Sequence, residues 1–182
     1  MKNLLIAGAA LALITGCTMK NPLLTESSAP FGAPQFDKIE NEHYLPAFEQ
    51  GIAEAKAEID AIVANTEEPT FENTIEAMEY AGETLNNVAG IFYNLMEANT
   101  NEQMQTIAEQ ISPMLTEYEM YVSLNPVLFE KVKSVYEKRN ELGLDQDQMK
   151  LLEDNYKGFV RGGANLSDED KALYSKWSEE LS

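Results

Sequence analysis

Residues 70–100 read TFENTIEAMEYAGETLNNVAGIFYNLMEANT, and this stretch decides the fold. Its apolar residues recur three or four positions apart, or at sums of those steps, so they lie on one face of a long helix. Pro69 and Thr70 predict the start of this helix, because proline ends the preceding segment and the threonine hydroxyl can cap a following amide. The apolar face comprises Phe71, Ile75, Met78, Leu85, Val88, Phe92 and Leu95.

Two glycines interrupt this pattern. Gly82 and Gly90 are positions where a helix can break or where a neighbouring helix can come close. The stretch is therefore predicted to form one core helix with a possible kink.

Helical spacing of apolar residues also occurs on both sides of this stretch. It predicts further helices over residues 41–65, 101–124, 126–140, 145–161 and 167–182, with a bend expected at Pro113. Alternating patterns typical of strands do not occur. The predicted fold class is all-α, a helical bundle of about six helices.

The first residues have the features of an export signal. Lys2 precedes a short apolar run, Leu4 to Ile14, and the following Ile14-Thr15-Gly16-Cys17 resembles the lipobox of bacterial lipoproteins. We therefore expect residues 1–16 to be a lipoprotein signal peptide and Cys17 to be the lipidated amino terminus. Two or more acyl chains would give stable membrane anchoring.

Residues 17–37 are rich in proline and small polar residues, which disfavour a regular helix. We predict an extended tether that lies on the protein, with Phe31 and Phe36 as the side chains that hold it there. Residues 38–182 then form the helical domain.

The charge balance excludes one class of partner. The 182-residue chain carries 13 basic and 31 acidic residues, a net charge of −18. Such a surface repels phosphate backbones, so we expect no nucleic-acid partner. Cys17 is the single cysteine, which excludes a disulfide within the chain.

No residues form a defensible catalytic or metal site. Asp145-x-Asp147 lacks the glycine and distal glutamate of a calcium loop, and negative charge at a helix start explains it. Glu72, Glu76 and Glu79 share a helix face, but a di-iron site needs accompanying histidines. His43 is the only histidine, and a role in the first turn of its helix is expected. We therefore assign no catalytic and no metal-binding residue.

Several segments in order resemble the amino-terminal part of the thimet oligopeptidase and peptidyl-dipeptidase family of zinc metallopeptidases, particularly its bacterial peptidyl-dipeptidase branch. Together these segments cover nearly all of residues 21–182. They are Asn21-Pro22-Leu23-Leu24, Pro30-Phe31-Gly32-Ala33-Pro34, His43-Tyr44-Leu45-Pro46-Ala47-Phe48, Pro69-Thr70-Phe71-Glu72-Asn73-Thr74-Ile75, Leu124-Asn125 with Leu128-Phe129, Leu151-Leu152 with Tyr156, Phe159-Val160-Arg161 and Gly163-Ala164-Asn165-Leu166.

The resemblance implies a mostly helical enzyme, several times longer, that releases dipeptides from the carboxyl ends of short peptides in a deep channel. It also implies zinc held by an H-E-x-x-H helix and a distant glutamate in the later part of the chain. That motif is absent from these 182 residues, so this segment is expected to form a channel wall, bind no zinc and be inactive alone. The expected location is the periplasm or outer membrane of a Gram-negative bacterium.

Three interpretations remain open from the sequence. The chain is the front of a longer peptidase, or a stand-alone helical lipoprotein that binds peptides or a partner protein, or a degenerate remnant without function. A reading frame that continues past Ser182 and encodes H-E-x-x-H would favour the first. A cooperative thermal transition of residues 21–182 alone would favour the second.

Overall fold

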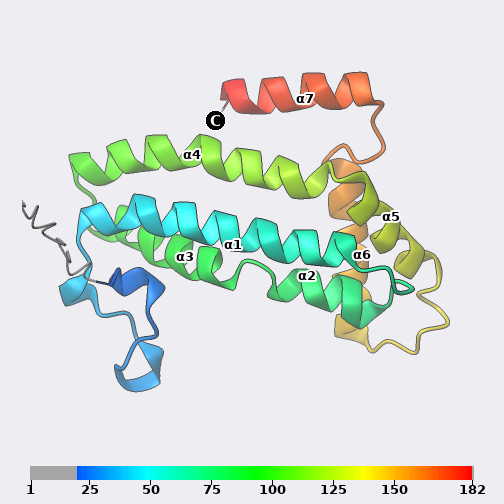
Figure 1. The fold of residues 1–182 in the computed structure, drawn as a ribbon, viewed down its shortest axis with the longest axis horizontal. Helices are drawn as coiled ribbons and strands as arrows, with labels where there is room; N and C mark the ends of the chain where they lie inside the picture. The colour runs from blue at the N-terminus through cyan, green and yellow to red at the C-terminus, as the bar shows by residue number, and fades with distance from the viewer. Residues whose placement is uncertain (1–19, 182) are drawn as a thin grey trace, which may run out of the picture.

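The computed structural model describes residues 20–181, which fold into a bundle of helices with no strand in that range (Figure 1). The principal helices are α1 (Tyr44–Ala64), α2 (Ala77–Tyr80), α3 (Glu83–Ala98), α4 (Glu102–Ser123), α5 (Pro126–Glu137), α6 (Gln146–Arg161) and α7 (Asp168–Leu181). All six expected helices are present among these residues, the second of them divided. None of the helices in the described range combines the length and hydropathy needed to cross a bilayer.

The stretch that was expected to be one helix consists of three pieces. A π-helical turn spans Phe71–Glu76, α2 adds one turn, and α3 follows after a break. The break lies at Gly82, whose φ of 79° is left-handed and favours glycine. Gly90 lies within α3 without interrupting it. The predicted kink is therefore confirmed at Gly82 and does not occur at Gly90.

The start of this stretch is organised by one side chain, Asn73. Its amide oxygen accepts hydrogen bonds from the Thr70 backbone N–H (2.8 Å) and the Thr74 hydroxyl (2.9 Å), and its Nδ2 donates to the Glu68 carbonyl (3.0 Å). The Asn73 N–H donates in turn to Thr70 Oγ1 (3.1 Å), which confirms the predicted cap. Thr74 is the buried polar residue of this region, and Asn73 provides its acceptor.

Asn73→Ala is expected to lower the free energy of unfolding by about 2 kcal/mol, since a lost helix cap costs about 1 kcal/mol and an unsatisfied buried hydroxyl about as much again. Urea denaturation followed by circular dichroism measures this loss. Asn73→Asp keeps the acceptor and loses only the donor, so it should lose less than half as much. Equal losses for the two variants would contradict the conclusion that the Asn73 amide oxygen, as acceptor for Thr70 and Thr74, accounts for most of the effect.

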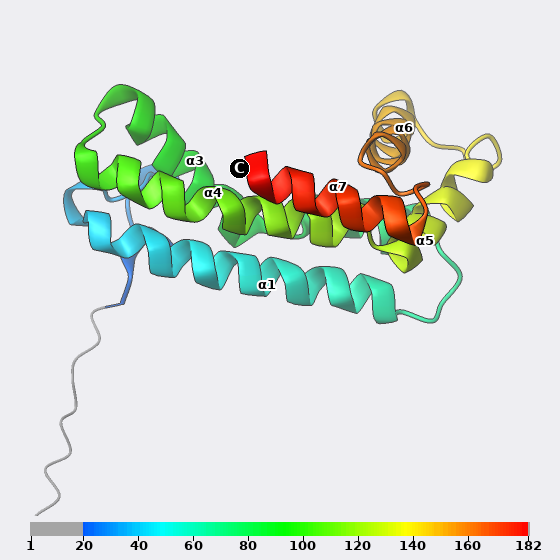
Figure 2. The same ribbon diagram turned by 90° about the horizontal axis from the view of Figure 1, so that it is seen from above.

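Two apolar cores lie along α1, which passes through both (Figures 1 and 2). One core joins the first half of α1 to α3 and α4, and we call it the α3–α4 core. The other joins the end of α1 to the π-helical turn, α5 and α6, and we call it the α5–α6 core. Gly51 permits the closest approach of α1 and α3, because a Cβ there would lie 3.0 Å from Leu85 Cα.

The segment before α1 is a chain of short 3-10 turns at Pro22–Leu24, Pro30–Gly32, Phe36–Lys38 and Asn41–His43. Leu23 packs into the α3–α4 core, and Asn21 Nδ2 donates to the His43 carbonyl (2.7 Å). The prediction that Phe31 and Phe36 hold this segment down is wrong. Their relative exposures are 107% and 54%, because the turn that carries them closes on its own hydrogen bonds and leaves both rings outside.

The last helix, α7, lies beside α4 (Figures 1 and 2). Its start is capped by Ser167, whose Oγ accepts from the Asp170 N–H (3.1 Å). Trp177 remains 58% exposed and Leu181 88% exposed, so α7 covers α4 without burying its own apolar residues.

Candidate functional site

The candidate site is a hollow of about 530 Å³ between α1, α2, α4 and α6. Its size lies within the range of small-molecule and side-chain pockets, about 300–1,000 Å³. The lining combines an apolar floor with a polar rim. The floor residues are Ile59, Met78, Val122 and Phe159, and the rim residues are Tyr118, Glu119, Ser123, Asp154 and Asn155.

Two glycines four residues apart, one in α6 and one at its C-cap, line the hollow on the side that faces α4. A Cβ at Gly162 would lie 3.2 Å from Ser123 Cβ, so the two helices are in close contact there. A Cβ at Gly158 would meet nothing within 4 Å, so one turn earlier the space remains open. The four-residue spacing of Gly158 and Gly162 is the sequence signal that could have indicated this site, and it was not used in the prediction.

Tyr118 brings a phenol from α4 to the rim. Burial, and to a smaller degree the Glu58 carboxylate, raises the pKa of Tyr118 above its usual value. The phenol is therefore protonated at neutral pH and can donate a hydrogen bond to a ligand in the hollow. Glu58 itself accepts a hydrogen bond of 2.6 Å from the Gly82 backbone N–H, which ties α1 to the break before α3.

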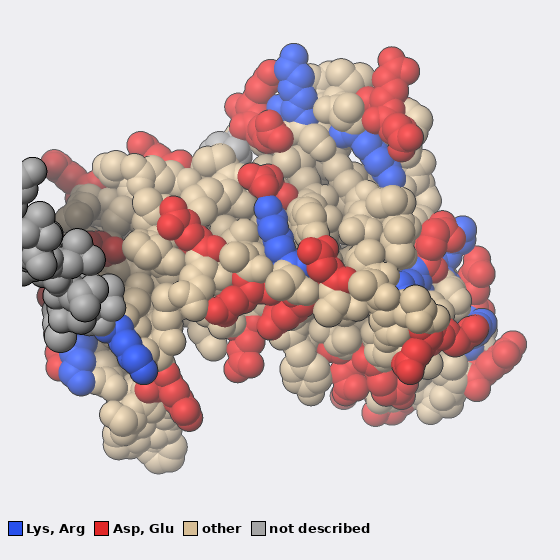
Figure 3. Space-filling model, viewed as in Figure 1, with Lys and Arg blue, Asp and Glu red and all other residues tan. Residues whose placement is uncertain are grey.

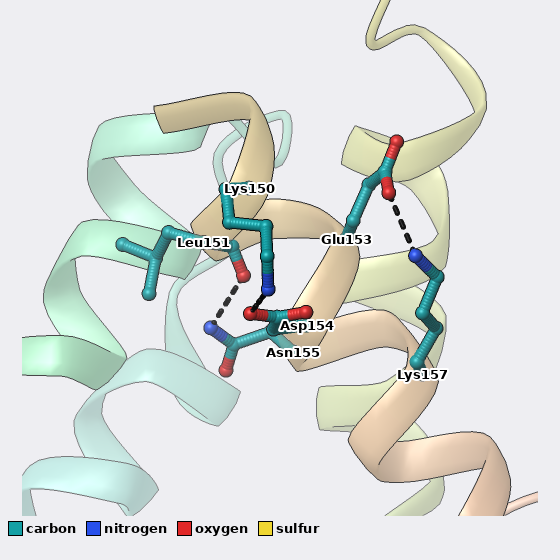
Figure 4. A network of polar contacts seen from close by, with 6 residues as sticks. All are labelled: Lys150, Leu151, Glu153, Asp154, Asn155 and Lys157. Atoms are coloured by element: carbon teal, nitrogen blue, oxygen red, sulfur yellow. Dashed lines mark hydrogen bonds and ion pairs between the residues drawn. The ribbon is translucent and has the colours of Figure 1, made fainter. Parts of the chain in front are cut away.

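The exposed surface of α6 carries two ion pairs, which Figure 4 shows as separate pairs along the helix. Lys150 pairs with Asp154, and Lys157 pairs with Glu153 at 2.7 Å. The hydrogen bond from the Lys150 ammonium lowers the pKa of the Asp154 carboxyl. The resulting stabilisation is present at neutral pH and is lost as the pH falls through this lowered pKa. Both pairs are solvent-exposed, so this contribution is small.

Asn155 is oriented by the backbone of its own helix. Its Nδ2 donates to the Leu151 carbonyl at 3.0 Å, one turn earlier (Figure 4). The rim therefore presents a phenol, a carboxamide and two carboxylates around apolar residues. This composition is suited to binding a peptide side chain or backbone and contains no pairing of a nucleophile with a base.

The residues considered as sites from the sequence lie elsewhere. Cys17 falls outside the described residues. His43 lies at the start of α1, as expected, where its Nδ1 accepts from the Glu40 N–H (2.9 Å). Asp145 caps α6 by accepting from the Gln148 N–H (2.9 Å), which confirms the helix-start interpretation. Within residues 20–181, no three His, Cys, Asp or Glu side chains are grouped to hold a metal ion, and this includes the glutamates of the π-helical turn and α2.

Comparison with known proteins identifies the family to which this helical domain belongs. Residues 48–171 match the family model "Neurolysin/Thimet oligopeptidase, N-terminal domain". The chain belongs to this family. The matched range contains all the residues that line the hollow, Asn73 with its hydrogen-bond partners, and most of both cores.

Relatives in the thimet oligopeptidase family include two bacterial enzymes named dipeptidyl carboxypeptidase. The Escherichia coli (strain K12) protein is 43% identical over 155 residues, which is 85% of this chain and 23% of the relative. The Salmonella typhimurium protein is 40% identical over 152 residues, 84% of this chain and 22% of the relative. Oligopeptidase A of Salmonella typhimurium is 25% identical over 164 residues, 90% of this chain and 24% of the relative. The chain thus spans less than a quarter of the length of each.

Proposed function

We propose that this chain is the amino-terminal domain of a longer, lipid-anchored zinc peptidase that releases dipeptides from the carboxyl ends of short peptides. The supporting observation is the difference in identity within the family, 43% to a dipeptidyl carboxypeptidase against 25% to an oligopeptidase A. This difference favours the activity that the name dipeptidyl carboxypeptidase describes over that of an oligopeptidase A.

The zinc of such a peptidase does not fit the described residues. The only histidine of the chain uses its Nδ1 at the start of α1, and residues 20–181 contain no grouped ligand set. In this proposal the ligands belong to a part of the protein beyond these residues. The domain then supplies a wall of the peptide channel, and alone it would cleave nothing.

The first test is the intact mass of the native protein extracted from membranes. We expect a mass several times the 20.3 kDa of this chain, together with zinc content and dipeptide release. A mass near 20 kDa, changed only by loss of the signal peptide and addition of acyl chains, would reject the proposal. It would favour a stand-alone helical lipoprotein that binds peptides or a partner protein.

The hollow between α4 and α6 is the surface that we assign to peptide contact. Gly158→Leu would fill it, because the space above Gly158 is empty within 4 Å. In the longer enzyme we expect KM to rise about tenfold with kcat little changed, the result of removing a contact made equally in the ground and transition states. Steady-state kinetics with a short peptide measures this.

The matched control for this variant is Gly90→Leu, a helical glycine on α3 whose Cβ would also meet nothing within 4 Å. It should leave KM unchanged. If Gly158→Leu also left KM unchanged while the enzyme remained folded and active, the hollow would not be a peptide-binding surface.

A further inference from the structure

The turn at residues 27–36 presents an aromatic ring outward in a fixed conformation. Phe31 has φ 60° and ψ 21°, a left-handed conformation that is unfavourable for a residue with a side chain, and its relative exposure is 107%. The ring therefore contributes nothing to either core of the domain, and the backbone beneath it is strained.

Hydrogen bonds within the turn hold this conformation. Ser27 Oγ donates to the Ala33 carbonyl (2.6 Å) and accepts from the Ala29 N–H (3.2 Å). The Gly32 N–H donates to the Ala29 carbonyl (3.1 Å), and the Ala33 N–H to the Pro30 carbonyl (3.3 Å). The exposure of Phe31 is thus a feature of a closed turn, and Phe36, 54% exposed, follows it as a second outward ring.

The turn differs in charge from the rest of the chain. Residues 27–36, SSAPFGAPQF, contain no charged side chain, although the whole chain has a net charge of −18. Lys20, Glu26 and Lys38 line the hollow at the foot of the turn, and Lys38 donates to Gln35. Figure 3 shows a tip without charged side chains that projects from the molecule, with both basic and acidic side chains at its base.

Exposed apolar rings on an uncharged turn are suited to the surface of a bilayer. Aromatic rings prefer the headgroup region, and interfacial elements insert about 5–10 Å into it. Phe31 also lies only 14 positions after Cys17, the expected lipid attachment residue. We infer that the turn at residues 27–36 inserts Phe31 and Phe36 into the membrane that carries the lipid anchor.

This inference rests on the proposed lipid anchor, and the test distinguishes failure of the anchor from failure of the turn to insert. The full chain with its signal sequence is produced in a lipidating bacterium and reconstituted into vesicles of phosphatidylcholine and phosphatidylglycerol. Trp177→Phe removes the single tryptophan, and Phe31→Trp in that background places one fluorophore at the tip. We expect vesicles with acyl-chain-brominated lipid to quench most of its emission, with a blue-shifted maximum.

The control is Leu142→Trp in the same background. Leu142 is 39% exposed in the loop between α5 and α6, which lies at the opposite end of the molecule from the turn in both views (Figures 1 and 2). Its emission should not respond to brominated lipid. Protein that fails to float with vesicles would refute the anchor and the inference together.

Two other outcomes refute the inference while the anchor stands. Floating protein whose residue-31 fluorophore has a red, unquenched emission would mean that the turn remains in water. A blue-shifted but unquenched emission would mean that protein covers the ring, either a second copy or a further part of a longer chain.

Discussion

Replacing Phe92 with alanine is expected to lower the free energy of unfolding by about 3–5 kcal/mol, the usual cost of removing a buried phenylalanine ring. Phe92 is fully buried in the α3–α4 core. Its ring lies edge-on to Tyr44 (centroids 4.9 Å apart) and to Phe48 (5.5 Å). The change therefore removes two aromatic contacts between α1 and α3 and leaves a cavity between the helices. Urea denaturation followed by far-ultraviolet circular dichroism measures the loss.

Phe36→Ala provides the comparison for Phe92→Ala. It deletes the same ring from a position that is 54% exposed, so the free energy of unfolding should change by less than about 0.5 kcal/mol. The difference between Phe92→Ala and Phe36→Ala measures the effect of burial, because both variants remove the same side chain. A loss below about 1 kcal/mol for Phe92→Ala would mean that α3 is not packed as described.

Gly51→Val is expected to lower the free energy of unfolding by about 3 kcal/mol, at the upper end of the usual cost of overpacking. The added Cβ would lie 3.0 Å from Leu85 Cα and 3.1 Å from Leu85 N. Both are backbone atoms of α3, which cannot rotate away as a side chain can. The two helices would have to separate, and the α3–α4 core would loosen with them. Thermal and urea denaturation both report the loss.

Gly90→Val separates this steric effect from helix propensity. Gly90 also lies within a helix, but its Cβ would meet nothing within 4 Å. Valine has a somewhat higher helix propensity than glycine, so stability should change by less than about 0.5 kcal/mol. Similar losses for the two variants would contradict a tight α1–α3 crossing at Gly51.

The helices were predictable because each carries a regular apolar face and a local start or stop signal. Thr70, Asn125, Asp145 and Ser167 act as helix caps through side chains that need only their own neighbours in sequence. The π-helical turn was not predictable, since its hydrogen bonding depends on how Phe71 and Ile75 fit between α5 and α6. The long apolar face is divided at Gly82, which has a left-handed backbone conformation. Glycine makes this conformation possible without requiring it, so the sequence alone does not predict the break.

The wrong expectation for Phe31 and Phe36 and the missed hollow have different causes. Phe31 and Phe36 were expected to be buried because aromatic rings usually are, but a turn closed by Ser27 and the Pro30 carbonyl directs them outward. The hollow beside Gly158 depends on where α6 crosses α4, a distance that no local pattern encodes. The peptidase assignment came from resemblance across the whole chain, because no described residue carries the chemistry.

The passage of α1 through both cores has a mechanical consequence. At about 1.5 Å per residue, its 21 residues form a rod about 30 Å long whose two ends are clamped in different cores. A displacement of its first turn is therefore coupled, through one helix, to the helices around the hollow. The two cores of the domain are therefore mechanically linked by a single helix.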